Sequence, residues 1–219
     1  GLNNYKSVET INLIDDLNSI SVTNLINKSI ENIPTLIKNN NNVIPVKLDT
    51  ESILNVQFGN DDGALFNDYL NKYGSIRSIK ASNINTNNLN SLLANYKLLI
   101  VSFHMKSDTP WGNMNKKFSL KELDILKIID KHNNKILTSF TNPYALSQIN
   151  LKSYNSIVVG FQNNQEFQKI IAQQIFGAKE IKGTLPVSIN DTFKEGAGII
   201  LKNLNILSYA DPEMVGVDR

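Results

Sequence analysis

The chain has 219 residues, 41% of them hydrophobic, and this is enough to bury one substantial core. Its 22 basic and 20 acidic residues are interspersed and leave a formal net charge of +2, which argues against a nucleic-acid partner, and no apolar run approaches the roughly 20 residues that span a bilayer. The absence of cysteine excludes disulfides and thiolate chemistry, and the presence of only two histidines argues against a multi-histidine metal centre.

The first 32 residues predict a helical segment. Its apolar residues recur at helical spacing: Leu13, Ile14, Leu17, Leu25, Ile26 and Ile30. Because the rest of this segment is polar and differs in pattern from the chain that follows, we expect a helical linker over residues 1–32.

The middle of the chain alternates between strand-like and helix-like patterns. Residues 53–58 predict a strand, and an apolar stripe at helical spacing follows it and stops at Gly74. A short strand at 76–79 and a weak helix at 89–96 come next. Residues 98–103 are continuously apolar, which predicts a central strand covered on both faces.

The same alternation continues toward the C-terminus. Ser119 and Glu122 form a capping-box pattern that predicts the start of a helix. Residues 136–140 predict a strand, and Pro143 fits the first turn of a short helix.

The last predicted unit is a strand at 157–161 followed by a helix. Asn163 and Glu166 are expected to begin this helix, and Gly177 to close it. Strands that alternate with helices predict a three-layer α/β/α sandwich with a mainly parallel sheet, here preceded by the helical linker.

Ligands of open parallel sheets bind beyond the carboxyl ends of the strands, so the loops there are the expected place for a site. The loop 59–63 holds two aspartates and lacks the dinucleotide pattern, which predicts a helix start and not a nucleotide site. Ser102 and Ser107 lack a nucleophile-elbow context, and His132, near a helix end, is interpreted as structural. We expect no cofactor.

The loop after the central strand holds one of the two histidines and the single tryptophan. Asp108 could serve as an acid or base, His104 could relay a proton, and Trp111 could stack on a sugar ring. The alternative is that Trp111 anchors the loop by burial against a neighbour. The residue types alone leave both interpretations open.

Residues 178–190, with 173–177 before them, resemble a family signature. The helix, Phe-Gly and Gly-x-Leu-Pro-Val-Ser pattern is similar to the C-terminal α/β/α sandwich domain of family 3 glycoside hydrolases. Segments 33–46 and 141–146 resemble other parts of that domain in the family's order. The resemblance covers about residues 20–207.

Within the family, the sequence looks closest to the β-N-acetylglucosaminidase branch of Bacteroidetes-type bacteria. The tail 209–218 is similar to the junction that leads into an appended serine β-lactamase-like domain. The resemblance therefore implies three parts: a linker from a barrel domain at 1–32, the sandwich domain at 33–207, and a linker to a downstream domain at 208–219.

The resemblance also implies that no catalytic residue lies in this chain. The family's aspartate nucleophile belongs to an N-terminal (β/α)₈ barrel. In β-glucosidase members the loop after the central strand carries an acid/base glutamate, whereas no glutamate occurs here between Ser102 and Lys121. In the N-acetylglucosaminidase branch, a histidine–aspartate pair on the barrel takes that role, which agrees with the missing glutamate.

The implied function is that of an accessory domain of a β-N-acetylhexosaminidase that hydrolyses terminal N-acetylglucosamine glycosides. Its partners would be the barrel of the same polypeptide and, through the parent enzyme, a glycan that contains N-acetylglucosamine. Four residues are candidates for facing the substrate or the barrel: His104, Asp108, Trp111 and Asn142. A cell-wall glycan as substrate would agree with export of the parent to the periplasm, but the sequence itself does not determine the compartment.

Two alternatives remain. The first is an independent α/β module that binds a small ligand, either a sugar or a nucleotide. The second is an autonomous hydrolase that uses His104 and Asp108. The second is the weaker, because retaining glycosidases require two groups that flank the scissile bond, and Asp108 cannot serve as both.

Overall fold

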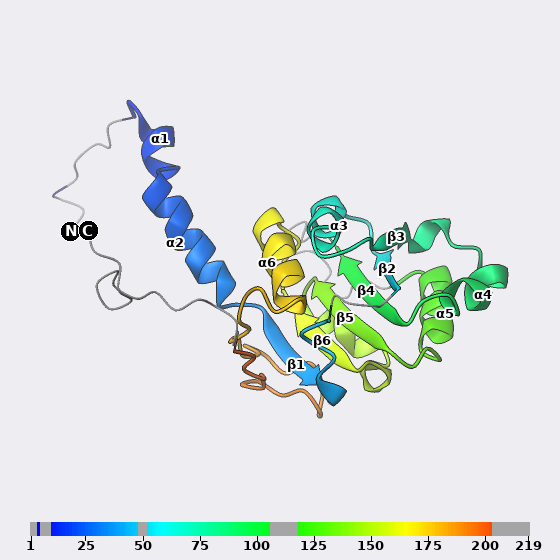
Figure 1. Ribbon diagram of the computed structural model, residues 1–219. Coiled ribbons are helices and arrows are strands. Elements are labelled where there is room, and N and C mark those ends of the chain that lie inside the picture. Colours follow the sequence, from blue (N-terminus) through cyan, green and yellow to red (C-terminus); the bar gives the residue numbers. More distant parts are fainter. Residues whose placement is uncertain (1–3, 5–9, 48–51, 106–117, 203–219) are drawn as a thin grey trace, which may run out of the picture.

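The computed structural model describes residues 4, 10–47, 52–105 and 118–202, and it contains a six-stranded sheet in the order β1-β6-β5-β4-β2-β3 (Figure 1). The strands are β1 (Thr35–Asn39), β2 (Ile53–Phe58), β3 (Arg77–Lys80), β4 (Leu98–His104), β5 (Lys135–Phe140) and β6 (Ser156–Val159). Strands β2 to β6 pair in parallel with their neighbours, and β1 pairs antiparallel with β6. The prediction of a mainly parallel sheet is confirmed.

Helices cover both faces of the sheet. The α-helices are α1 (Leu13–Leu17), α2 (Ile20–Glu31), α3 (Ala64–Leu70), α4 (Leu89–Leu93), α5 (Leu120–Ile129) and α6 (Gln165–Ile175). The short 3-10 helices are η2 (Asn40–Asn42), η3 (Ala81–Asn83), η4 (Thr86–Asn88), η5 (Pro143–Gln148) and η6 (Leu151–Ser153). Helices α3 and α6 pack on one face and α4 and α5 on the other, which gives the predicted three-layer α/β/α sandwich.

Strand β4 lies at the centre of the sheet, and all seven of its residues are buried. Leu98 and Ile100 belong to the core under α3 and α6, whereas Leu99, Val101 and Phe103 belong to the core under α4 and α5. Successive side chains of a strand point to opposite faces, so a strand covered on both faces must be apolar throughout. The prediction from the continuous apolar run is confirmed.

The predicted start of α5 and end of α6 are confirmed, whereas α3 ends at Leu70, before Gly74, and α4 ends at Leu93, before residue 96. The Ser119 hydroxyl accepts from the Glu122 N–H while the Glu122 carboxylate accepts from the Ser119 N–H, which is a complete capping box at the start of α5. Gly177 follows α6 with φ +73°, a conformation that favours glycine. One cap was predicted wrongly, because the side chain of Asn164, and not that of Asn163, accepts from the Phe167 N–H and caps α6.

Helices α1 and α2 extend away from the sandwich (Figure 1). Within α2 only Ile30 is buried, and most of the larger apolar side chains of the two helices are exposed among the described residues. The helical character predicted for the first 32 residues is present in their described part, whereas their role as a linker stays a prediction. None of the described helices combines the length and the apolar character that a membrane crossing requires.

Candidate functional site

The strand order places the candidate site between β2 and β4. The chain leaves β2 toward β3 on one side and then returns to β4 on the other side of β2, so the crossovers diverge at this point. In doubly wound sheets a ligand crevice forms where the connections diverge, at the carboxyl ends of the strands. The last residue of β4, His104, and the loop 59–63 after β2 lie at this edge.

His104 is buried at this edge, with a relative exposure of 1%. Its ring stacks on Phe140 with centroids 4.6 Å apart and an angle of 14° between the planes, and it also contacts Phe66. Its Nδ1 lies 2.9 Å from Oδ1 of Asn163. Since an amide oxygen can only accept, Nδ1 carries the proton, and Nε2 of the neutral ring is left as an acceptor. Nε2 has no hydrogen-bond partner among the described residues.

Two amide side chains connect His104 to the neighbouring loops. Asn163 Nδ2 and Gln168 Nε2 each donate to the Asp62 carbonyl oxygen at 2.9 Å, and Gln168 Nε2 also lies 2.9 Å from Asn163 Oδ1. Gln168 Oε1 in turn accepts from the Phe66 N–H at 2.9 Å. The network therefore holds the loops after β2 and β6 in a fixed position relative to the end of β4.

The loop 59–63 fits closely against His104, and two glycines make this possible. Gly59 has φ +93°, and a Cβ there would overlap the His104 carbonyl oxygen. A Cβ on Gly63 would lie 2.7 Å from His104 Nε2. The Gly63 carbonyl oxygen accepts from Gln57 Nε2 at 3.1 Å. Any other residue at Gly59 would force the backbone at the end of β4 to move, and one at Gly63 would displace the side chains of Gln57 and His104.

The environment of His104 disfavours its charged form. Burial lowers the pKa of His104 from 6.5 to about 4, and Lys80 also lowers it, whereas the hydrogen bond to Asn163 and the charges of Asp61 and Asp62 oppose the shift. The ring is therefore neutral near neutral pH. A neutral, buried imidazole with Nδ1 committed to Asn163 has no proton to give at Nε2, so this arrangement does not supply a general acid.

The carboxylates of the loop 59–63 serve the backbone. Asp61 Oδ1 accepts from the Asp62 N–H at 2.8 Å, and Asp62 Oδ1 accepts from the Ala64 N–H at 2.9 Å, in the first turn of α3. This geometry agrees with the interpretation of the loop as a helix start. Among the described residues, no three acidic or histidine side chains converge in a way that could hold a metal ion.

Of the other predicted site residues, only Asn142 lies in the described part of the chain. Asp108 and Trp111 lie outside the described residues. Asn142 is half-buried, and its Oδ1 accepts from the Tyr144 N–H at 3.0 Å in the turn that opens η5. No described hydrogen bond joins Asn142 to His104. Whether any of these residues faces a substrate or a barrel stays a prediction.

The remaining polar residues considered from the sequence have structural contacts. Ser102 is buried, and its hydroxyl donates to Asn55 Oδ1 at 3.0 Å. His132 lies beyond the end of α5, with Nε2 2.9 Å from the Tyr96 carbonyl oxygen and Nδ1 3.1 Å from that of Asn134. These contacts agree with structural roles for Ser102 and His132, whereas Ser107 lies outside the described residues.

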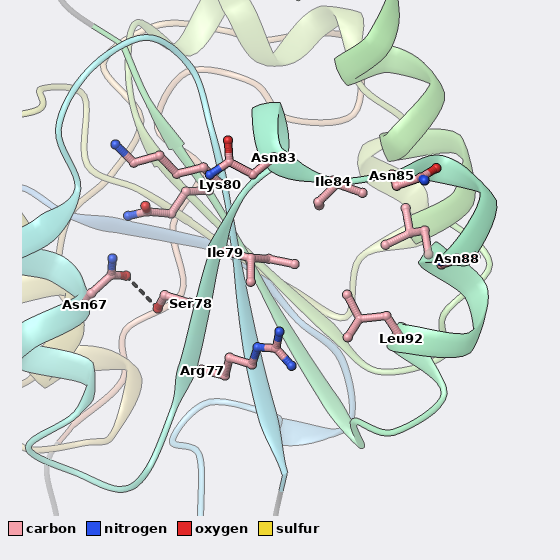
Figure 2. A pocket seen from close by; sticks show the side chains of 12 residues that line it. Asn67, Arg77, Ser78, Ile79, Lys80, Asn83, Ile84, Asn85, Asn88 and Leu92 are labelled. Carbon is pink, nitrogen blue, oxygen red and sulfur yellow. Dashed lines mark hydrogen bonds between the residues drawn. The ribbon is translucent and has the colours of Figure 1, made fainter.

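Sequence reasoning missed a cavity of about 640 Å³ at the outer edge of the sheet. It borders Arg77 and Lys80, the first and last residues of β3 (Figure 2). Two cations in a four-residue strand are a sequence signal, but charges on edge strands commonly serve only to prevent aggregation. The cavity itself depends on η4 and α4, which the pattern of the sequence does not place beside β3.

Comparison of the sequence with family models and with curated proteins finds no match. Solved structures do match. A fungal multi-domain family 3 β-N-acetylglucosaminidase with a GCN5-related glucosamine N-acetyltransferase region has a TM-score of 0.64 at 17% identity, over 85% of this chain and 21% of that chain. A β-glucoside phosphorylase has a TM-score of 0.61 at 19% identity, over 86% of this chain and 35% of that chain.

A family 3 β-N-acetylglucosaminidase from Paenibacillus sp. str. FPU-7 has a TM-score of 0.58 at 14% identity, over 85% of this chain and 36% of that chain. Family 3 glycoside hydrolases are thus among the structural neighbours of this chain. The likeness at these identities shows the fold alone. The chain spans between 21% and 36% of the length of these three neighbours, which are larger proteins.

Proposed function

We propose that this chain is a non-catalytic accessory domain of a family 3 β-N-acetylhexosaminidase that removes terminal N-acetylglucosamine, and that it packs against the (β/α)₈ barrel of the same polypeptide. One observation carries the proposal: the fold likeness covers 85% of this chain but only 21% and 36% of two β-N-acetylglucosaminidases. The sandwich is therefore one part of each of those larger chains. The loop from His104 to residue 115 would rim the cleft of the barrel.

The proposed division of the chain follows the sequence prediction. Residues 1–32 are the linker from the barrel, 33–207 the sandwich domain and 208–219 a linker to a further domain. Two features support the boundary near residue 33. Strand β1 begins at Thr35 and joins the sheet, whereas α1 and most of α2 extend away from the sandwich, with only the end of α2 packed on α6 through Ile30 (Figure 1).

The geometry of the described edge supports a non-catalytic role. Retaining glycosidases use two groups on either side of the scissile bond. Here His104 is buried and neutral, and the carboxylates of Asp61 and Asp62 accept backbone hydrogen bonds. The chemistry of the parent enzyme is accordingly assigned to the barrel.

The exposed apolar side chains of α1 and α2 support a neighbouring domain. Large exposed apolar surfaces in soluble proteins commonly mark contacts with other protein surfaces. The exposed members are Ile14, Leu17, Ile20, Val22, Leu25 and Ile26. A barrel connected to this segment would be held beside these side chains by the connection itself, which lowers the entropic cost of docking.

An activity assay tests the proposal. The 219-residue chain is incubated with 4-nitrophenyl N-acetyl-β-D-glucosaminide, and the release of nitrophenol is followed. We expect no turnover above that of the buffer, because both catalytic groups belong to the barrel. Robust hydrolysis that Asp108→Ala abolishes would refute the proposal and favour an autonomous hydrolase.

The strand order favours a second candidate, an independent module that binds a small ligand at the divergence between β2 and β4. Calorimetry of the chain with N-acetylglucosamine and with adenosine nucleotides separates the two candidates. Micromolar binding that Gly59→Ala abolishes would favour the module, since a Cβ there overlaps the His104 carbonyl oxygen at the carboxyl end of β4. Absence of binding at that edge agrees with the accessory domain.

A further inference from the structure

The cavity of about 640 Å³ lies across the free edge of β3. Ser78 and Asn67 border it on one side of the strand, and Ile79 and Leu92 border it on the other (Figure 2). Among the described residues β3 pairs with β2 and with no other strand, so its outer backbone N–H and C=O groups are not used by the sheet. A ligand in the cavity would meet this edge and both of its flanks.

Two cations give the cavity its charge. Arg77 and Lys80 border it, and none of the described residues that line it is acidic. A strand rises about 3.3 Å per residue, so their Cα atoms lie about 10 Å apart. Figure 2 shows the two side chains on opposite flanks of β3, Arg77 on the flank of Leu92 and Lys80 on the flank of Asn67. At a free edge, long side chains of both flanks can turn outward toward a ligand that lies along the edge. Arg77 has only a 3.4 Å contact with the Tyr96 hydroxyl, and Lys80 has no hydrogen bond in the described part of the chain.

A buried hydrogen-bond chain fixes one amide in the wall. Asn67 Oδ1 accepts from Asn55 Nδ2 at 2.7 Å and from the Ser78 hydroxyl at 2.8 Å. Asn55 Oδ1 in turn accepts from the Ser102 hydroxyl in the centre of the sheet. With its oxygen committed in this way, Asn67 has its Nδ2 group left to donate to a ligand, in an orientation that the sheet has already set.

The other flank combines amides with an apolar surface. Ile79, Ile84, Leu89 and Leu92 form the apolar part, and the side chains of Asn83 and Asn88 border it. Amides offer both a donor and an acceptor and therefore match hydroxyl groups, while aliphatic side chains match the C–H face of a ring. The wall thus provides charge, hydroxyl recognition and an apolar surface together.

We propose that this cavity binds a small polyhydroxylated anion, the chemistry shared by sugar phosphates and sugar acids. The anionic group binds at the edge of β3 between Arg77 and Lys80, and the hydroxyl groups bind the amides of Asn67 and Asn88. The site lies at the free edge of β3 and reaches Gln57 in β2, whose amide also donates to the Gly63 carbonyl oxygen. The proposal does not depend on the proposed role as an accessory domain.

The test is titration of the 219-residue chain, labelled with ¹⁵N, with four probes: glucose 6-phosphate, glucuronate, glucose and inorganic phosphate. We expect at least one of the two sugar anions to bind more tightly than both glucose and phosphate, with amide shifts concentrated at 77–80 and 83–89. The tighter of the two sugar anions identifies the anionic group. Arg77→Gln and Lys80→Gln should each weaken binding about tenfold, since each removes a charge-assisted contact.

Lys131→Gln is the matched control, because Lys131 is exposed and does not border the cavity. It should leave the affinity unchanged. The proposal is overturned if no sugar anion binds, if glucose or phosphate alone binds as tightly, or if Lys131→Gln weakens binding as much as Arg77→Gln does. Such a failure would leave the outcome of the glycosidase assay untouched, so the two proposals fail separately.

Discussion

Histidine is a common catalytic residue, but His104 is buried and belongs to the packed interior of this fold. It ends β4, stacks on Phe140 and donates through Nδ1 to Asn163. The unfolded chain exposes this imidazole to water, where its pKa is 6.5, whereas burial lowers the pKa to about 4 in the folded chain. Folding and protonation of His104 are therefore linked.

The linkage predicts a loss of stability in mild acid. Between pH 6.5 and 4 the unfolded chain takes up a proton at His104 that the folded chain does not, so the free energy of unfolding falls as the pH falls through this window. One pKa unit is worth about 1.4 kcal/mol. From pH 7 to pH 5, the free energy of unfolding of the native chain should fall by about 2 kcal/mol more than that of the His104→Gln variant. Urea unfolding at the two pH values measures both changes.

His132→Gln provides the control, because it removes the other histidine of the chain, which lies beyond the end of α5 and contacts the backbone carbonyl oxygens of Tyr96 and Asn134. This variant keeps His104 and should therefore retain the loss of stability assigned to that residue. If His104→Gln and the native chain lose the same free energy between pH 7 and pH 5, the buried neutral state assigned to His104 is wrong.

Gly183 lies against the backbone of another segment of the chain. It belongs to the Gly-x-Leu-Pro-Val-Ser pattern, and a Cβ at this position would lie 2.6 Å from the Pro34 carbonyl oxygen and overlap that of Ile33. The pattern thus requires glycine because the chain passes closely over the start of β1. The glycine of the pattern that carries the sequence resemblance is thus explained by close contact with the backbone of residues 33 and 34.

Gly183→Ala should therefore lower the free energy of unfolding by about 1–3 kcal/mol, since the contacted atoms are backbone and must shift. Gly74→Ala is the matched control, because nothing lies within 4 Å of a Cβ there. It should change the stability by less than about 0.5 kcal/mol. Equal effects of the two substitutions in urea unfolding would contradict this account of the pattern.

At the scale of elements, α2 has apolar side chains that are mostly exposed to solvent among the described residues. Its apolar side chains match those of a packed helix, yet Leu25 is 66% exposed among the described residues. A helix keeps such a surface when a partner covers it, and the proposed partner is the barrel of the parent enzyme.

Leu25→Glu should weaken binding of the chain to a separately expressed barrel domain by at least about tenfold, because burial of a leucine is worth about 1.5–3 kcal/mol. The melting temperature of the chain itself should not change. Leu120→Glu, at a position that is 83% exposed on α5, should alter neither quantity. Unchanged barrel binding of Leu25→Glu in calorimetry would exclude this face as the docking surface.

Elements with strong local signals could be predicted from the sequence. The apolar run of β4 and the capping box at Ser119 depend on neighbouring residues only, and both are where the sequence placed them. Strand β1 was not predicted, because Leu36 and Ile37 form too short an apolar run between Pro34 and the asparagines. Its strand character comes from pairing with β6, more than a hundred residues away in the chain.

At the scale of the whole molecule, the arrangement around His104 depends on contacts between residues far apart in the chain. Sequence patterns report on near neighbours and therefore do not predict these contacts. His104 and Asn163 are 59 residues apart, and Gln168 and Asp62 are 106 apart. Asn163 was assigned to a helix cap because local spacing favoured that role. The cavity at β3 likewise needs Arg77 and Leu92 to be brought together by the fold.

The central claim is that this sandwich serves a larger glycosidase. The most direct measurement is the hydrolysis of 4-nitrophenyl N-acetyl-β-D-glucosaminide by the complete gene product that contains this chain, with and without residues 33–207. The account predicts hydrolysis by the complete product and a large loss of activity on deletion. A folded complete product that hydrolyses no N-acetylglucosaminide, or one whose activity is unchanged by the deletion, would contradict it.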